Sequence, residues 1–144
     1  MNFERLKLER KKRGYTQQNV ADFLEVQRAT YAGWETGKDI MPLRQLFKVA
    51  NNYQISLDYL TGLSNTNSKV KSKTTKIDVD QVSENIHNFR KEKGLTQKQV
   101  AKALQTTQSN IHKYETGKCL ITTMYALQFS KLYSYPLDKL LNRK

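Results

Sequence analysis

Apolar residues recur at helical spacing along the chain, in short segments that end at residues typical of helix termini. In the first segment Phe3 and Leu6 share one side, and Gly14 stands where a helix commonly ends. Thr16 is suited to cap a second helix that carries Val20. The same pattern predicts further helices at about 28–36, at about 43–52, and between Ser56 and Gly62. The alternation typical of strands is nearly absent, so the expected fold class is all-α.

The second half of the chain repeats the first at an offset of 80 residues and without a gap. The segment TQQNVADFLEVQRATYAGWETGK (16–38) aligns with TQKQVAKALQTTQSNIHKYETGK (96–118). Between positions 10 and 60, sixteen of 51 aligned pairs are identical, which is far above chance. We therefore expect two five-helix domains, over residues 1–63 and 80–144. In the second copy Thr96 and Gln99 also have the spacing of a capping box.

Residues 64–79, with the sequence SNTNSKVKSKTTKIDV, separate the two copies. This stretch is rich in Ser, Thr, Asn and Lys and has few apolar residues, so it buries too little surface to offset the entropy lost on ordering. We expect a flexible basic linker. Its lysines either keep the linker extended or follow a groove of a polyanion; they are Lys69, Lys71, Lys73 and Lys76.

The charge of the chain narrows the class of partner. The formal net charge is +12 and the sequence pI is about 9.8, which favours nucleic acid or an anionic membrane surface. The sequence has no apolar segment long enough to span a bilayer and no apolar core of a secretory signal near its start, so we expect no membrane partner. Its single cysteine, Cys119, fits a reducing compartment, and the expected location is the cytoplasm.

The motifs of catalysis and metal binding are missing from the sequence. It has no convincing carboxylate pair, no glycine loop that cradles phosphate and no nucleophile elbow. His87 and His112 have no Cys, His or Asp partners at the spacing of metal ligands. We therefore expect a protein that is not an enzyme and that has neither a metal site nor a cofactor.

The second and third helices of each copy are separated by a short turn, and the third is amphipathic, which is the pattern of a helix-turn-helix. Tyr31 and Trp34 fall on the inward side of the third helix. One α-helix fits the roughly 12 Å wide major groove of B-DNA, where Arg, Lys, Gln, Ser and Ala side chains can meet base edges. The outward residues are Arg28, Ala29, Ala32 and Gly33 in the first copy and Gln108, Ser109, His112 and Lys113 in the second.

The motif TQxxVAxxL, followed by a helix that ends in an aromatic residue and ETGK, resembles the lambdoid phage repressor and Cro domains of the XRE-type helix-turn-helix family. The segment ISLDYLTG (55–62) is similar to the last helix of that family. The resemblance covers about 120 of the 144 residues, and its spacing holds twice. It implies a transcriptional regulator, with repression favoured, that binds double-stranded DNA sequence-specifically.

The resemblance also implies roles for matching positions. Base contacts are expected from Arg28, Ala29, Gly33, Gln108, Ser109 and Lys113. Contacts to the DNA backbone are expected from residues at the start of the second helix, which are Thr16, Gln17, Thr96 and Gln97. Each of the two glutamines is further expected to brace the first residue of the third helix. Two pairs match a partly buried structural ion pair without a DNA contact, Arg10 with Glu35 and Arg90 with Glu115.

The two copies leave alternatives open. In the first copy Gln27 stands at the cap position of the third helix, and Ala29, Ala32 and Gly33 are small. Small residues either let the backbone approach DNA closely or mean that this copy reads few bases and mainly grips phosphate. Both copies bind adjacent half-sites in one hypothesis, with or without a homodimer. In the other, one copy, favoured to be the first, is a dimerisation or protein-partner module, as in an antitoxin or a phage or host regulatory factor.

Overall fold

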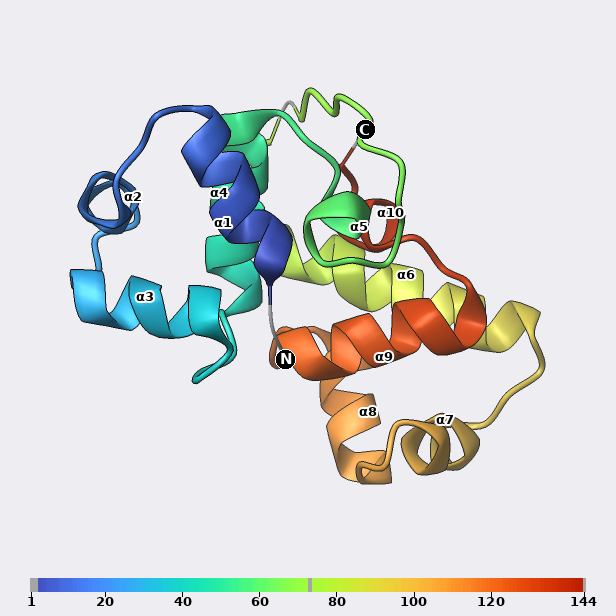
Figure 1. Cartoon of the computed structure of the whole chain (residues 1–144). Coiled ribbons are helices and arrows are strands. Elements are labelled where there is room, and N and C mark those ends of the chain that lie inside the picture. The colour runs from blue at the N-terminus through green and yellow to red at the C-terminus, as the bar shows by residue number, and fades with distance from the viewer. Residues whose placement is uncertain (1–2, 73, 144) are drawn as a thin grey trace. The chain divides into compact units, whose positions relative to one another are not determined.

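The structure is a computed structural model that describes residues 3–72 and 74–143, so the linker residue Lys73 lies outside the described residues (Figure 1). The chain divides into two compact units, which are Met1–Thr75 (unit 1) and Lys76–Lys144 (unit 2). In the described part of the chain the regular elements are all α-helices, ten in number. This confirms the predicted all-α class with two five-helix domains.

The helices of the two units correspond at the same offset of 80 residues that the sequence repeat shows. Unit 1 contains α1 (Glu4–Lys12), α2 (Gln17–Phe23), α3 (Arg28–Thr36), α4 (Leu43–Tyr53) and α5 (Leu57–Leu60). Unit 2 contains α6 (Val79–Glu92), α7 (Gln97–Ala103), α8 (Gln108–Thr116), α9 (Thr123–Tyr133) and α10 (Leu137–Leu140). The first helix of unit 2 is the longer of the two because Asp78, within the predicted linker, caps it: the Asp78 side chain accepts a hydrogen bond from the Gln81 N–H.

Local sequence explains where the helices begin and end. Gly14 has a φ of 71°, a left-handed conformation that glycine adopts at low cost, and it follows α1. Thr16 accepts a hydrogen bond from the Asn19 N–H at the start of α2. The Asn19 side chain returns the contact to the Thr16 N–H, so unit 1 has a capping box of its own. The sequence pattern predicted this box only for unit 2, where Thr96 and Gln99 form it.

Each unit encloses a core of aliphatic and aromatic side chains. In unit 1, α3 packs against α1 and α2, and α5 packs against α1 and α4. Leu6, Tyr31, Leu46 and Leu60 are each fully buried there. In unit 2, α8 packs against α6 and α7. Its core includes a cluster of four rings with centroids 5.2–5.7 Å apart, formed by Phe89, Phe129, Tyr133 and Tyr135.

The first part of the predicted linker pairs with unit 1. The Ser56 N–H donates to the Ser68 carbonyl, and the Val70 N–H donates to the Gln54 carbonyl, both at 3.1 Å. These bonds frame an isolated antiparallel bridge between Ile55 and Lys69. Unit 1 therefore extends beyond the predicted boundary at residue 63, while the flexibility of the linker stays a prediction.

Candidate nucleic-acid interface

The helices α3 and α8 each have a buried face and an exposed face. Tyr31 and Trp34 of α3 are 0% and 5% exposed, so they belong to the core as the sequence predicted. Ile111 and Tyr114 of α8 are buried in the same way. The opposite faces present side chains to solvent: Arg28 and Ala29 in unit 1, and Gln108, Ser109 and Lys113 in unit 2. Five of the six residues expected to contact bases are therefore accessible.

Gly33 is the exception, because the structure places it in a buried position rather than on the exposed face. The loop after α3 folds back over it: the Asp39 N–H donates to the Gly33 carbonyl at 3.2 Å. A Cβ atom at position 33 would lie 3.1 Å from the Asp39 Oδ2 atom. The expectation that Gly33 lies on the exposed face is therefore wrong, because an acidic side chain covers this backbone, whereas its base contact stays a prediction. Lys113, its counterpart in unit 2, is exposed.

The residues expected to contact the DNA backbone lie at the starts of α2 and α7. Thr16 and Thr96 are exposed at these helix starts. The Gln17 Oε1 atom accepts a hydrogen bond from Arg28, the first residue of α3, at 3.3 Å. Gln97 has a different partner, because its amide donates to the Glu115 carboxylate at 3.4 Å. The brace expected from the glutamine thus reaches the start of the third helix in unit 1 only.

Both halves of the chain match known domains of one kind. Residues 6–60 match a family described as "Helix-turn-helix", and residues 83–144 match one described as "Helix-turn-helix domain". The chain belongs to the helix-turn-helix proteins. This confirms the XRE-type resemblance that its motifs predicted, and it agrees with the expectation that the chain is not an enzyme.

Two curated relatives from Bacillus subtilis (strain 168) are similar to part of this helix-turn-helix protein. An alignment of 57 residues is 44% identical to the "SPbeta prophage-derived uncharacterized HTH-type transcriptional regulator YonR", and it covers 40% of this chain and 53% of that protein. Another of 57 residues is 40% identical to the "Uncharacterized HTH-type transcriptional regulator YqaE", with 40% and 49% coverage. The alignments thus span about half of each relative's length.

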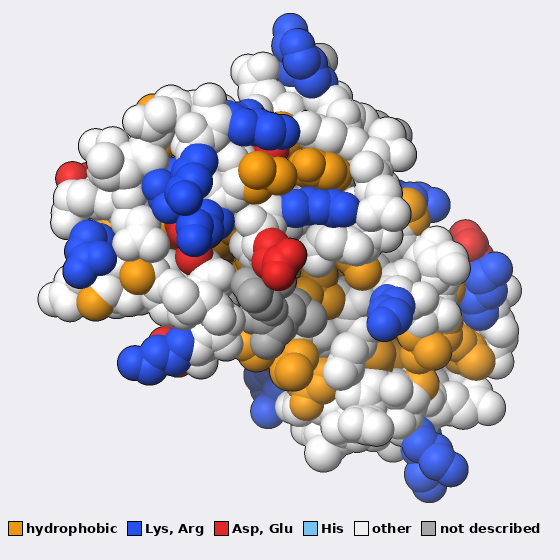
Figure 2. Space-filling model, viewed as in Figure 1, with side chains coloured by type: hydrophobic (Ala, Val, Ile, Leu, Met, Phe, Trp, Pro, Cys, Tyr) orange, Lys and Arg blue, Asp and Glu red, His pale blue; other side chains and the backbone are white. Residues whose placement is uncertain are grey.

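Basic side chains outnumber acidic ones on the face of the molecule shown in Figure 2. Lys and Arg side chains are scattered there over a mostly uncharged surface, and acidic side chains are fewer. The formal net charge of +12 is consistent with this distribution. None of the described helices combines the length and apolar character needed to cross a membrane.

Buried ion pairs hold α3 and α8, the second helices of the two helix-turn-helix motifs (the recognition helices), against the first helix of each unit. In unit 1 the Arg10 Nε atom lies 2.8 Å from a Glu35 oxygen, and the two side chains are 8% and 2% exposed. In unit 2 Arg90 and Glu115 make the same contact at 2.6 Å. Burial by itself raises the pKa of both carboxyl groups, but the hydrogen bonds that they accept, first among them those from the arginines, together with the positive charge of the arginines, leave each pKa below the ordinary value. Both expected ion pairs are thus present.

In unit 2 a third side chain, His87, contacts the carboxylate of the ion pair, and the sequence motifs did not indicate this contact. The His87 Nδ1 atom lies 2.8 Å from Glu115, and its side chain is 45% exposed. With Arg90 and Gln97, this makes three side chains around one carboxylate. The counterpart of His87 in unit 1 is Lys7, so the repeat does not carry this contact over.

The two recognition helices also differ at the cap residue that precedes each of them. Thr107 accepts a hydrogen bond from the Asn110 N–H at 3.1 Å and caps α8. Gln27 makes no such bond at α3, as its residue type predicted. The turns that precede the two helices share an unexpected strain, because Glu25 and Gln105 have φ angles of 59° and 58°, where glycine is favoured. The residue types at these two positions do not predict the strain, which is seen only in the backbone dihedral angles.

Proposed function

We propose that the chain is a transcriptional regulator that binds double-stranded DNA sequence-specifically with both helix-turn-helix units. The observation that carries the proposal is that each unit presents a nine-residue helix with one face locked in the core and the other open to solvent. A helix of this kind fits the major groove of B-DNA. The two relatives named as HTH-type transcriptional regulators support it. The cytoplasm is the proposed site of action.

In this proposal the two units read different bases. Unit 1 offers Arg28, which suits guanine, and Ala29, which suits the methyl group of thymine. Unit 2 offers Gln108 for adenine and Lys113 for guanine, with Ser109 able to meet either kind of edge. Thr16, Gln17, Thr96 and Gln97 hold the DNA backbone. The operator would then contain two unlike half-sites, because the exposed faces of α3 and α8 share no residue type at these positions.

The proposal is tested by selecting binding sites from randomised duplex DNA and measuring affinity for the selected site across a salt series. Affinity should fall steeply with salt, since each lysine or arginine contact to phosphate releases counterions. Lys113→Ala should lower the preference for the selected site over random duplex by about 1–3 kcal/mol. Lys131→Ala, which removes the same charge from an exposed position on α9, is the matched control and should leave that preference unchanged. Failure to select any site would refute sequence-specific binding.

A second function is favoured by the covered backbone of Gly33. Gly33 has no side chain and Asp39 lies over its backbone, so α3 has fewer groups that can reach bases than α8 has. In this second function, unit 1 is a dimerisation or protein-partner module while unit 2 binds DNA. Arg28→Ala distinguishes the two functions in the full chain. Loss of preference at one half-site supports DNA reading by unit 1, whereas unchanged DNA binding with an altered sedimentation coefficient supports the interaction module.

The direction of regulation is proposed to be repression, on the strength of the resemblance to phage repressors. A reporter placed behind the selected site should show lower expression when the chain is present. Lys113→Ala should restore expression, and Lys131→Ala should not. Higher expression with the unaltered chain would show activation instead.

A further inference from the structure

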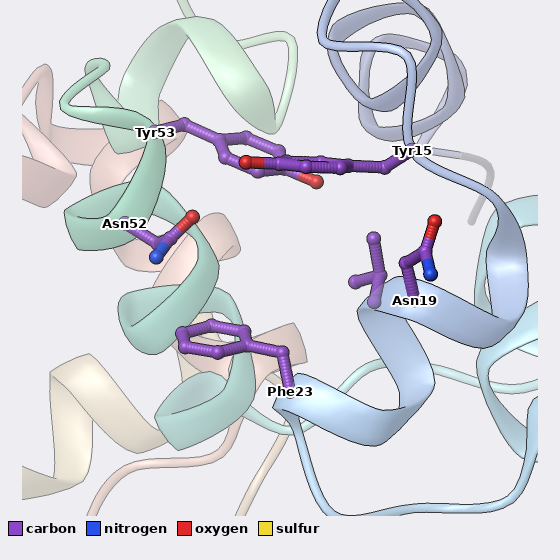
Figure 3. A pocket seen from close by; sticks show the side chains of 6 residues that line it. Tyr15, Asn19, Phe23, Asn52 and Tyr53 are labelled. Atoms are coloured by element: carbon purple, nitrogen blue, oxygen red, sulfur yellow. The ribbon is translucent and has the colours of Figure 1, made fainter.

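A hollow of about 210 Å³ lies between α2 and α4 of unit 1, and neither the recognition helix nor the ion pair contributes to it. Figure 3 shows the rings of Tyr15 and Tyr53 along one side, with Phe23, Asn19 and Asn52 around the rest. Val20 completes the lining. The hollow thus combines aromatic faces with amide groups.

The aromatic side chains of the hollow are open to a ligand. Tyr15 and Phe23 are 42% and 39% exposed, so part of each ring is accessible to a molecule in solution. The rings of Tyr15 and Tyr53 are stacked, with centroids 6.3 Å apart and planes 25° apart. The Lys48 Nζ atom lies 5.1 Å from the centre of the Phe23 ring. A flat ring placed in the hollow therefore meets other rings.

The polar groups of the hollow include one that the described structure leaves without a partner. Tyr53 is 7% exposed, and its buried hydroxyl group makes no hydrogen bond. Burial raises the pKa of Tyr53 to about 12, so the hydroxyl stays protonated and can donate. Buried polar groups in folded proteins usually have partners, which makes this one informative. The amides of Asn19 and Asn52 lie at exposed positions on the same hollow.

The aromatic residues that line the hollow in unit 1 are not all repeated in unit 2. At the offset of 80 residues, Leu95 replaces Tyr15 and Ala103 replaces Phe23, while Tyr133 matches Tyr53. Leu132 stands in place of Asn52. The helix-turn-helix fold is thus built in unit 2 without these rings, and so the fold itself does not require them.

We propose that this hollow is a binding site for a small planar aromatic molecule that carries an amide or similar hydrogen-bonding group. The size fits, because an enclosed cavity of about 150 Å³ is known to hold one benzene ring. Ring faces favour an aromatic ligand over a saturated one of the same shape. The polar edge of the ligand accepts a hydrogen bond from the Tyr53 hydroxyl once the exposed Tyr15 ring moves aside. Asn19 and Asn52 donate to the same edge.

A ligand bound in the hollow would change the contacts at the start of α2. This part of the inference rests on the proposed function. Tyr15 precedes Thr16, and the Asn19 side chain accepts from the Thr16 N–H at 2.9 Å. A ligand that displaces Tyr15 and engages Asn19 therefore disturbs the residues proposed to hold the DNA backbone. DNA affinity should fall, and by linkage DNA should weaken ligand binding by the same factor.

The test is a titration of the full chain with benzamide, followed by two-dimensional 1H–15N NMR. The expected result is a saturating shift of the backbone amides around Tyr15, Asn19 and Asn52, with unit 2 as the unshifted internal control. Cyclohexanecarboxamide keeps the polar group without the planar ring, and it should bind about three- to tenfold more weakly. Equal binding of both compounds, or shifts spread over both units, would overturn the aromatic site.

Variants that copy unit 2 into unit 1 separate binding from folding. Tyr15→Leu with Phe23→Ala should abolish the benzamide shifts, and both residues are compatible with this fold at positions 95 and 103. Asn52→Leu alters only an exposed side chain and should weaken binding without affecting the thermal transition. Benzamide binding that survives all three changes would refute the assignment.

A final measurement, of DNA affinity with and without benzamide, tests the ligand site separately from the proposed DNA binding. Saturating benzamide should lower affinity for the selected DNA at least about fivefold, and not in the variant with Tyr15→Leu and Phe23→Ala. Localised benzamide binding with no change in DNA affinity would overturn the coupling alone. A chain that selects no DNA would overturn the proposed function, while the NMR shifts would still decide the ligand site.

Discussion

Replacing Glu115 by glutamine should lower the free energy of unfolding of unit 2 and leave that of unit 1 unchanged. Glu115 is 2% exposed in its side chain and receives hydrogen bonds from Arg90 at 2.6 and 2.9 Å. His87 lies 2.8 Å from the same carboxylate, and Gln97 donates to it at 3.4 Å. Removing the negative charge leaves the guanidinium group of Arg90, 9% exposed, without a counter-charge. The variant Glu115→Gln keeps the shape and removes only the charge.

The magnitude follows from the burial of the pair. Removing one partner of a buried ion pair costs roughly 3–5 kcal/mol, against about 0–1 kcal/mol for an exposed pair. We expect about 3 kcal/mol, because the glutamine oxygen still accepts from Arg90 and the exposed His87 adds little. A domain of this size has a total stability of roughly 3–10 kcal/mol. The loss is therefore a third or more of the stability of unit 2.

The assay uses the single tryptophan, Trp34, which lies in unit 1 and reports the unfolding of that unit alone. Far-UV circular dichroism reports the helices of both units. In Glu115→Gln, part of the helical signal should melt at least about 10 °C earlier while the Trp34 transition keeps its midpoint. The matched variant Glu35→Gln should shift the Trp34 transition instead.

The double variant Arg90→Met with Glu115→Leu removes both charges of the buried pair and tests whether the cost comes from the charge left unpaired. A buried pair replaced by apolar side chains of similar volume is often neutral or stabilising. The double variant should therefore be more stable than Glu115→Gln. A cost below about 1 kcal/mol for Glu115→Gln would refute the reasoning, since it would mean that the pair behaves as an exposed one.

Three further predictions concern stability. The pKa values of Glu35 and Glu115 are lower in the folded state than the ordinary 4.5, so their stabilisation is present above about pH 4.5 and is lost as pH falls through the lower folded values; urea midpoints should stay level from about pH 7 to 5 and decline below about 4. Gly117→Ala should cost at least about 1–2 kcal/mol in thermal melts, because φ is 78° and a Cβ atom would lie 2.7 Å from Asp80 Oδ1; an unchanged melting temperature would contradict this. Gln27→Thr should add the missing cap to α3 and raise the tryptophan-reported stability by about 1 kcal/mol, whereas a lower midpoint would count against the cap.

The sequence was sufficient for features that depend on near neighbours. Helix limits at Thr16 and Gly14 follow from capping and left-handed preferences, and the repeat at 80 residues predicted the second unit from the first. The buried faces of α3 and α8 followed from helical spacing. These features are local, so a window of a few residues contains their cause.

Features that depend on distant residues were missed or predicted wrongly. Gly33 was expected on the exposed face because helical spacing cannot show that Asp39 folds back over it. The capping box of Thr16 and Asn19 was missed because asparagine is not the usual partner at that position, although its amide oxygen can accept the same bond. The contacts proposed with DNA depend on a second molecule and stay predictions.

The bridge between Ile55 and Lys69 has a consequence for how far apart the two units can travel. While Ser68 and Val70 are paired and the Asn51 amide donates to the Thr74 carbonyl, only residues 75–77 separate these contacts from the cap residue Asp78. A segment from Thr74 to Asp78 reaches about 14 Å at full extension, roughly a quarter of the reach of the stretch 64–79. A short connecting segment confines one unit to a smaller volume around the other and so raises its local concentration. Breaking the hydrogen bonds at Thr74 and around this bridge would lengthen the connecting segment and lower that local concentration.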